Sequence, residues 1–299
     1  MKTQEIEISI GIIKINSSYV CLRRNTSPYE KYIEFPGGKK NANEDISSCL
    51  VREIQEELNI SLTKYKYLGF IKHLYKNVLI KINIFKIFRY DGEITSNENR
   101  EIVLYNFDST HEILPTHTRI LNILYTPKLL KIISIESFKN NDNLDLSIYR
   151  FIRLRDISYD VYIKNVKEKI INANFTGNII IDFPYNQSWR EKYYGIHYKS
   201  SQFKNFNSES RDSRYIYSAS CHTPNDILAC NEKYFNFILI SPLLDTYNEY
   251  PILGWSKFSE LSLMSYCPTL ALGGVSSANQ DFSDSIKKYG FGIAGVSQI

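Results

Sequence analysis

Three glutamates stand close together in the first half of the chain, and their spacing suits metal chemistry. Glu53, Glu56 and Glu57 lie at positions i, i+3 and i+4, which makes them neighbours on a helix. Their mutual repulsion costs roughly a few tenths of a kcal/mol per pair. Hard divalent cations such as Mg²⁺ offset this cost, because they bind carboxylate oxygens while keeping several waters. A solvated acidic helix face is the alternative interpretation.

The flanking residues favour the metal site. Gly37 and Gly38 let the backbone approach the carboxylates, and a backbone carbonyl there can add a ligand. Arg52 can pair with a carboxylate and hold the cluster in place. Residues 45–58 are predicted to form the helix that carries these groups. Its apolar residues recur every four positions and form one buried stripe: Ile46, Leu50, Ile54 and Leu58.

Apolar segments around this helix predict the sheet on which it packs. Strands are expected at residues 7–13, 19–22, 32–35, 67–73 and 78–88, and a second helix at 117–124. The segment from Gly38 to Ile60 resembles the signature of Nudix hydrolases, and every charged position matches. The single departure is Asn59, where the family has Gly; both residues tolerate the left-handed backbone that follows a helix.

The resemblance implies the catalytic group. Glu53, Glu56 and Glu57 would bind Mg²⁺, with Mn²⁺ as a substitute, together with Gly37 and steadied by Arg52. Glu53 would also serve as the base toward the attacking water. Two metal ions would activate that water and neutralise the diphosphate leaving group. The expected activity is therefore pyrophosphate hydrolysis.

Nearly all of residues 1–124 resembles the MutT type of this family, which cleaves oxidised purine nucleoside triphosphates to the monophosphate and pyrophosphate. The resemblance implies that Phe35 contacts the substrate. Arg24, or its neighbour Arg23, would meet phosphate oxygens, and Lys39 is a further phosphate ligand. The matching segments are residues 11–13, 22–24 and 33–39.

Two departures from the MutT pattern affect the site. The type carries one more metal-binding glutamate in a later loop, for which we name Glu98, although the spacing leaves Glu101 open. His117 stands where the type has an Asn that reads the purine edge. An imidazole offers one donor and one acceptor but not the carboxamide geometry. This weakens the assignment to 8-oxo-dGTP without affecting the hydrolase assignment.

Beyond Tyr125, short apolar strands alternate with helical segments, which predicts a parallel sheet or barrel. The strands are expected near residues 131–136, 148–154, 177–182, 194–198, 214–218, 236–241, 268–272 and 291–295. We expect an α/β protein with two domains. Residues 1–124 would form a Nudix α/β/α sandwich with a mixed sheet, and residues 131–299 a (β/α)₈-type barrel. The barrel would be reduced, because it has fewer residues than the roughly 250 of a typical barrel. A polar loop at 138–147 would replace its first helix.

The second half resembles thiamin phosphate synthase and TenI proteins, most clearly at residues 218–222, 271–275 and 292–297. The resemblance implies a phosphorylated thiazole or pyrimidine ligand, held by backbone N–H groups at strand ends. The implied phosphate contacts are Thr246, Gly273, Gly274, Gly295 and Ser297. The synthase chemistry is damaged: Asp182-Phe183 stands in place of an acidic metal pair. His197 and His222 are expected to be structural.

The composition indicates which partners and which location to expect for this protein. No apolar run reaches the roughly 18 residues of a membrane span, and the N-terminus lacks signal-peptide character, so a cytoplasmic protein is expected. Lys and Arg exceed Asp and Glu by two in each part, 17 against 15 up to residue 124 and 19 against 17 beyond it. This balance predicts no face for polymeric nucleic acid. The five cysteines show no metal spacing and should be reduced.

Two functions stay open. The first is hydrolysis of a nucleoside triphosphate of the 8-oxo-dGTP kind, which would clean the nucleotide pool and so serve DNA repair. The second is a thiamin-pathway role, in which the first half trims a thiamin-related phosphate or diphosphate and the barrel binds the product. The intact glutamate pattern favours the first, and the lost barrel residues oppose the second. The barrel would then be a non-catalytic binding or assembly module.

Overall fold

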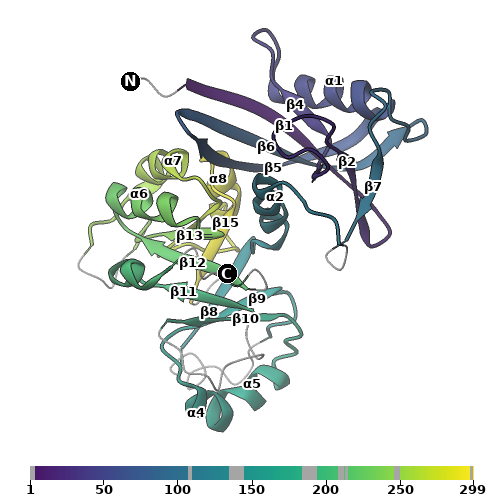
Figure 1. Ribbon diagram of the computed structural model, residues 1–299. Coiled ribbons are helices and arrows are strands. Elements are labelled where there is room, and N and C mark those ends of the chain that lie inside the picture. Colours follow the sequence, from purple (N-terminus) through teal and green to yellow (C-terminus); the bar gives the residue numbers. More distant parts are fainter. Residues whose placement is uncertain are drawn as a thin grey trace. The chain divides into compact units, whose positions relative to one another are not determined.

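The computed structural model describes residues 4–106, 110–134, 145–183, 194–207, 212, 215–245, 250–296 and 299. The chain divides into two compact units, Met1–Leu124 and Tyr125–Ile299. Figure 1 shows the elements of both units.

The first unit is built on a mixed sheet, as predicted. The strand order is β3-β2-β1-β6-β5, with β4 paired to β1 and β7 paired to β2. Strand β1 runs parallel to β6, whereas its pairing with β2 and β4 is antiparallel. The strands are β1 (Gln4–Ile15), β2 (Ser18–Arg23), β3 (Ile33–Glu34), β4 (Gly37–Lys39), β5 (Ser61–Tyr75), β6 (Val78–Asp91) and β7 (Ile102–Tyr105).

Helices α1 (Ile46–Leu58) and α2 (Pro115–Tyr125) lie on opposite faces of this sheet (Figure 1). Asp45 caps α1 by accepting hydrogen bonds from the backbone N–H groups of the first turn. The predicted stripe of α1 is buried: Leu50, Ile54 and Leu58 pack against residues of β1, β2 and β6. Because this apolar face anchors the helix, its glutamates are held on a rigid element.

The second unit is a closed barrel of eight parallel strands, in the circular order β10-β11-β12-β13-β14-β15-β8-β9. All eight strands match predicted segments. They are β8 (Leu129–Ile133), β9 (Phe151–Leu154), β10 (Asn178–Asp182), β11 (Gly195–Tyr198), β12 (Ile216–Cys221), β13 (Phe237–Ile240), β14 (Thr269–Leu272) and β15 (Gly292–Gly295). The predicted parallel barrel is therefore confirmed, without a reduction in its number of strands.

The connections between the strands are partly described. Strand β9 is followed by α4 (Tyr159–Val161), a π-helical turn η1 (Tyr162–Val166) and α5 (Lys167–Asn172). A 3₁₀ helix, η3 (Ser200–Asn205), follows β11 in place of an α-helix. The later connections hold α6 (Pro224–Lys233), α7 (Gly254–Met264) and α8 (Asp281–Lys287). Most of the predicted polar loop at 138–147 lies outside the described residues.

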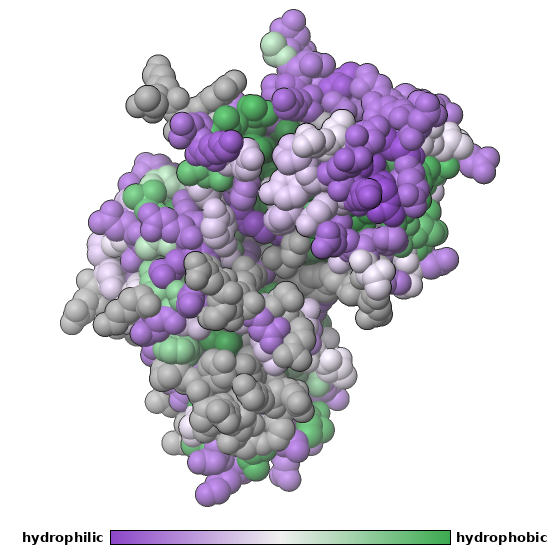
Figure 2. Space-filling view, viewed as in Figure 1, coloured by the Kyte–Doolittle hydropathy of each residue, from purple (hydrophilic) through white to green (hydrophobic). Residues whose placement is uncertain are grey.

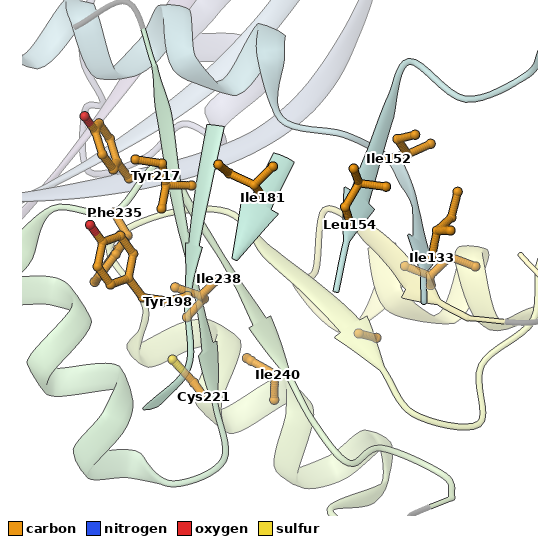
Figure 3. Packing of buried hydrophobic residues seen from close by; sticks show 14 of the residues in the cluster. Ile133, Ile152, Leu154, Ile181, Tyr198, Tyr217, Cys221, Phe235, Ile238 and Ile240 are labelled. Atoms are coloured by element: carbon orange, nitrogen blue, oxygen red, sulfur yellow. The ribbon is translucent and has the colours of Figure 1, made fainter. Parts of the chain in front are cut away.

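Alternating strand residues build two apolar layers in the barrel. One layer packs against the surrounding helices and includes Ile133, Leu154, Ile181 and Ile240 (Figure 3). The other layer contains strand residues such as Phe151, Phe237 and Leu270, with no helical residue among its buried members, and so fills the barrel interior. This interior is a packed core.

In the view of Figure 2, hydrophilic residues cover much of the first unit, and hydrophobic residues show in separate patches. Among the described helices, none combines the length and the apolar character needed to cross a bilayer.

Candidate active site

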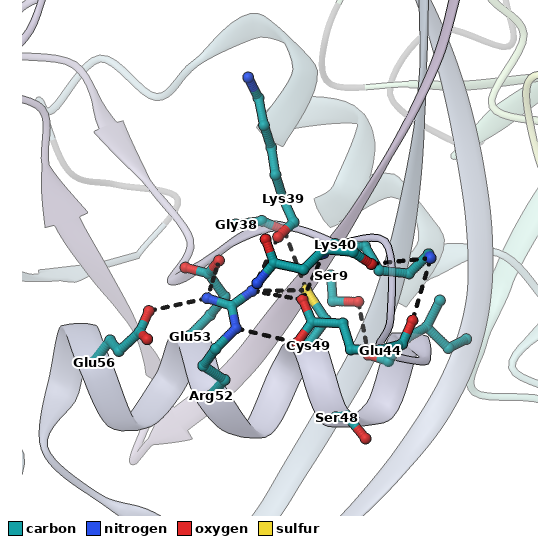
Figure 4. A network of polar contacts seen from close by, with 12 residues as sticks. Ser9, Gly38, Lys39, Lys40, Glu44, Ser48, Cys49, Arg52, Glu53 and Glu56 are labelled. Carbon is teal, nitrogen blue, oxygen red and sulfur yellow. Dashed lines mark hydrogen bonds and ion pairs between the residues drawn. The ribbon is translucent and has the colours of Figure 1, made fainter.

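Arg52 is the centre of the polar network on α1 (Figure 4). Its Nη1 donates to Glu53 Oε1 at 2.8 Å and to Glu56 Oε2 at 3.0 Å. Its Nη2 donates to Glu44 Oε1 at 2.7 Å and to the carbonyl of Lys39 at 3.0 Å. These contacts link Arg52 to two glutamates of α1, and they tie the helix to the segment that precedes it.

Glu53 and Glu56 differ in environment although both contact Arg52. The Glu53 side chain is 16% exposed and that of Glu56 is 54% exposed. Burial raises the pKa of Glu53, while the ion pair with Arg52 opposes the rise. Glu53 is therefore a stronger proton acceptor than an ordinary solvent-exposed carboxylate.

Glu57 is the most buried of the three glutamates, with a side chain 8% exposed. Its Oε2 accepts a hydrogen bond from the Gly37 backbone N–H at 2.7 Å, and its Oε1 accepts one from Arg100 Nη1 at 2.6 Å. Burial raises the pKa of Glu57 to about 7 in spite of these partners. The site thus holds one exposed, one half-buried and one buried carboxylate.

Neighbouring atoms lie very close to the backbone of the two glycines. Gly37 has φ +136°, and a Cβ there would lie 2.1 Å from the Ser9 carbonyl oxygen. A Cβ on Gly38 would lie 2.4 Å from the carboxylate of Glu53. Only glycine therefore fits at position 37, whereas a side chain at position 38 would displace the carboxylate of Glu53.

The two acidic candidates in the loop before β7 have different partners. Glu101 forms an ion pair with Arg23 at 2.6 Å, and its side chain is 61% exposed. Glu98 lies 3.9 Å from Arg100, the residue that holds Glu57. The geometry therefore brings Glu98, rather than Glu101, toward the glutamates of α1.

Guanidinium groups lie between the carboxylates in this conformation. Within the described ranges, no three His, Cys, Asp or Glu side chains are arranged to hold a metal ion. The donor chemistry nevertheless suits a hard divalent cation, since it consists of carboxylates beside the bare backbone of Gly37 and Gly38. The residues fit such a cation once Arg52 or Arg100 yields carboxylate oxygens.

His117 lies on α2 next to Phe35. The two rings are stacked with centroids 5.8 Å apart. The His117 side chain is buried, its Nδ1 lies 3.2 Å from Thr116 Oγ1, and its Nε2 has no hydrogen-bond partner. Burial lowers the pKa of His117 to about 4, so the ring is neutral near pH 7. An orphaned polar atom of this kind calls for a ligand or another explanation.

The three predicted cationic phosphate ligands are placed differently. Arg24 Nη1 donates to Glu34 Oε2 at 2.6 Å, and Arg23 pairs with Glu101. Lys39 is exposed, and its side chain extends away from the network in Figure 4. Arg23 and Arg24 are thus engaged in ion pairs with carboxylates in this conformation.

Sequence reasoning missed Glu34 and Arg100. Glu34 accepts hydrogen bonds from both Arg24 and Arg100, and so links the residue that follows β2 to the loop before β7. Glu34 precedes Phe35 in the matched motif, which was a usable signal. Arg100 had no such signal, because its role arises from a contact with Glu57 across 43 residues.

The barrel residues with predicted roles are only partly described. Gly273 and Gly274 have φ of +102° and +73°, and a Cβ on Gly274 would meet the backbone and Cβ of Asp245 within 2.8 Å. A Cβ on Gly295 would meet the side chain of Ile299. Thr246 and Ser297 lie outside the described residues. An acidic residue next to Gly274 is unfavourable for an anionic ligand there.

The barrel histidines are held by neighbouring groups. His197 is fully buried, with Nδ1 2.9 Å from Ser218 Oγ and Nε2 2.8 Å from Ser220 Oγ. His222 Nδ1 lies 2.8 Å from the Ser241 carbonyl, and its ring stacks on Tyr250. Both ring nitrogens of His197 are satisfied within the barrel, which favours the structural role expected for it.

Comparisons with known proteins cover the first unit. Residues 6–125 match the NUDIX domain. The 8-oxo-dGTP diphosphatase of Buchnera aphidicola subsp. Schizaphis graminum is 38% identical over 98 residues, which are 33% of this chain and 73% of that protein. The 8-oxo-dGTP diphosphatase of Proteus vulgaris is 30% identical over 100 residues, 33% of this chain and 89% of that protein.

Solved structures match the same part of the chain. The MutT NUDIX hydrolase from Burkholderia pseudomallei is 19% identical, with a TM-score of 0.36, and the match covers 38% of this chain and 93% of that one. The chain belongs to the Nudix family, and it is a Nudix hydrolase.

Proposed function

We propose that the first unit is a Mg²⁺-dependent pyrophosphohydrolase that cleaves a nucleoside triphosphate of the 8-oxo-dGTP kind to the monophosphate and pyrophosphate. The observation that carries the proposal is the set of three glutamates on α1, which lie beside the side-chain-free backbone of Gly37 and Gly38. Arg52 holds two of these glutamates, and the Gly37 N–H and Arg100 hold the third. The sequence relatives support the substrate class, since both of those named above are 8-oxo-dGTP diphosphatases.

The residues that would hold the divalent ions are Glu53, Glu56, Glu57 and the Gly37 carbonyl, with Glu98 from the loop. When bound, such ions lower the pKa of a coordinated water and neutralise charge on the departing diphosphate. Mg²⁺ suits this set, because it prefers carboxylate and carbonyl oxygens and keeps waters of its own. Mn²⁺ can substitute for Mg²⁺ in such an oxygen site.

Glu53 is the residue that would take the proton from the attacking water. Its burial raises its pKa above the ordinary range, and a base is most effective when its pKa approaches the working pH. Arg52 holds Glu53 through Nη1 and braces it against Glu44 through Nη2. Arg52 thus acts on the orientation of the base and not on the substrate.

Phe35 and His117 would meet the base of the nucleotide. The neutral His117 ring has an unpaired Nε2, to which a purine edge could supply the missing hydrogen bond. One imidazole nitrogen makes a single contact where a carboxamide makes two. We therefore expect weaker discrimination between 8-oxo-dGTP and dGTP than an Asn at this position would give.

The barrel is proposed to be a non-catalytic binding or assembly module. Two of its buried polar groups are satisfied by their neighbours: Arg153 makes two hydrogen bonds to Asp182, and His197 bonds to two serines. Polar groups whose hydrogen bonds are already made inside the core are poorly placed to bind a phosphorylated thiazole or pyrimidine. Truncation after Leu124 should therefore leave hydrolysis intact.

The test is pyrophosphate release by the full-length protein in Mg²⁺, with 8-oxo-dGTP, dGTP and thiamin diphosphate as substrates. Faster turnover of 8-oxo-dGTP than of dGTP, by up to roughly a hundredfold, would support nucleotide-pool cleaning. Better turnover of thiamin diphosphate would overturn the proposal in favour of a thiamin-pathway role. Glu53→Gln controls for contaminating phosphatases, because it should lose activity on every substrate.

A further inference from the structure

Arg100 is a cation placed inside the acidic site. Its side chain is 9% exposed, although it comes from the loop between β6 and β7. Its guanidinium donates to Glu57 Oε1 at 2.6 Å, to Glu34 Oε1, and to the backbone carbonyl of Arg23 at 3.2 Å. Each of its three nitrogens thus has an acceptor. A buried arginine bound in this way is a fixed part of the site and not a surface charge.

These contacts leave Glu57 with both oxygens in use. One oxygen accepts from the Gly37 N–H and the other from Arg100. A divalent cation that takes Glu57 as a ligand must therefore replace Arg100 at Oε1. Arg52 stands apart from this competition, because its carboxylate partners are Glu44, Glu53 and Glu56.

We propose that Arg100 is the internal counter-ion of Glu57 in the metal-free protein, and that it is exchanged for the divalent cation when the site loads. The inference rests on the metal site of the proposed function. It assigns Arg100 a positioning role that sets the affinity for the metal and keeps the unit folded without it. A buried carboxylate left unpaired would otherwise be costly.

The loop that carries Arg100 makes the exchange local. Its start is anchored, since the Thr95 N–H donates to the Leu58 carbonyl and the Asn97 N–H to the Glu57 carbonyl. Glu98 stands two residues before Arg100 and lies 3.9 Å from its guanidinium. When Arg100 leaves Glu57, Glu98 is close enough to follow as the additional carboxylate. One short segment thus provides the cation Arg100 when no metal ion is bound, and the carboxylate Glu98 when the metal ion is bound.

The experiment measures Mn²⁺ affinity and metal-free stability in the full-length protein. Free Mn²⁺ is followed by electron paramagnetic resonance, and thermal unfolding is recorded in EDTA and in Mn²⁺. Arg100→Gln should bind Mn²⁺ roughly tenfold more tightly, because the competing charge-assisted hydrogen bond is gone. It should also unfold at a lower temperature than the wild type in EDTA. Its unfolding temperature should rise more on addition of Mn²⁺ than that of the wild type does. Arg100→Lys should lie between the two.

The control is Lys81→Gln, which removes a half-buried cation of the first unit whose carboxylate partner, Glu7, lies outside the site. It should leave Mn²⁺ affinity unchanged. Equal or weaker Mn²⁺ binding by folded Arg100→Gln and Arg100→Lys would overturn the counter-ion role alone. Failure of the wild type to bind Mn²⁺ would instead sink the proposed metal dependence, and this inference with it.

Discussion

At the scale of single residues, Glu53 shows how burial raises the proton affinity of a carboxylate. Its carboxylate is desolvated and its pKa is raised. Glu53→Gln keeps the shape and removes the proton acceptor, so turnover should fall at least about a hundredfold. Folding stability in EDTA should be unchanged or higher, since a neutral amide is buried more cheaply than a carboxylate. Steady-state kinetics and thermal unfolding check both parts; lost stability together with lost activity would point to a structural role.

His117 makes the first unit sensitive to acid. Its pKa is about 4 in the folded state and about 6.5 in an unfolded chain, so the unfolded state binds the extra proton between these values. The contribution of His117 to the free energy of unfolding should therefore be fully present above pH 6.5. It should be lost as the pH drops toward 4, which lowers the free energy of unfolding by up to roughly 3 kcal/mol.

The variant His117→Gln isolates this contribution, because other acid-sensitive groups remain in both proteins. Denaturant unfolding at pH 7 and pH 4.5 should show a smaller loss in the variant than in the wild type. The transition of the first unit is recognised by its shift with metal. Equal losses in both proteins would mean that His117 is protonated in the folded state.

At the scale of elements, Asn59 ends α1 in the left-handed conformation, with φ +55°. Its N–H bonds to the Gln55 carbonyl, and its side chain reaches Thr95 Oγ1 at 3.3 Å. Asn59→Gly should change stability by less than about 0.5 kcal/mol, because glycine adopts this conformation freely. Asn59→Ala should cost about 1 kcal/mol. Denaturant unfolding compares the two; an equal cost for both would show that the side-chain contact, and not the backbone, matters.

The elements also show which parts of the structure could be predicted. The stripe of α1 and all eight barrel strands follow from local periodicity, because apolar runs must be buried. Strand β7 was missed, since four residues carry little signal and its pairing with β2 is non-local. Arg100 was missed for the same reason: spacing along a helix reveals Glu53, Glu56 and Glu57, but not a partner brought in by a distant loop.

At the scale of the whole molecule, each unit has a core of its own. The barrel holds a nearly dry ion pair, Arg153 with Asp182, whose side chains are 4% and 7% exposed. Removing one partner of such a pair leaves a buried charge uncompensated, whereas replacing both with apolar groups is often neutral. This pair therefore offers a way to weaken the second unit without touching the hydrolase site.

Arg153→Met should destabilise the second unit by about 3–5 kcal/mol, and the double variant Arg153→Met with Asp182→Leu should recover most of the loss. Calorimetry of the full chain should then show two unfolding transitions, of which only the one insensitive to metal moves. Hydrolysis by Arg153→Met, measured below that transition, should match the wild type. A parallel loss of hydrolysis, or one transition that shifts as a whole, would show instead that the barrel supports the Nudix unit energetically.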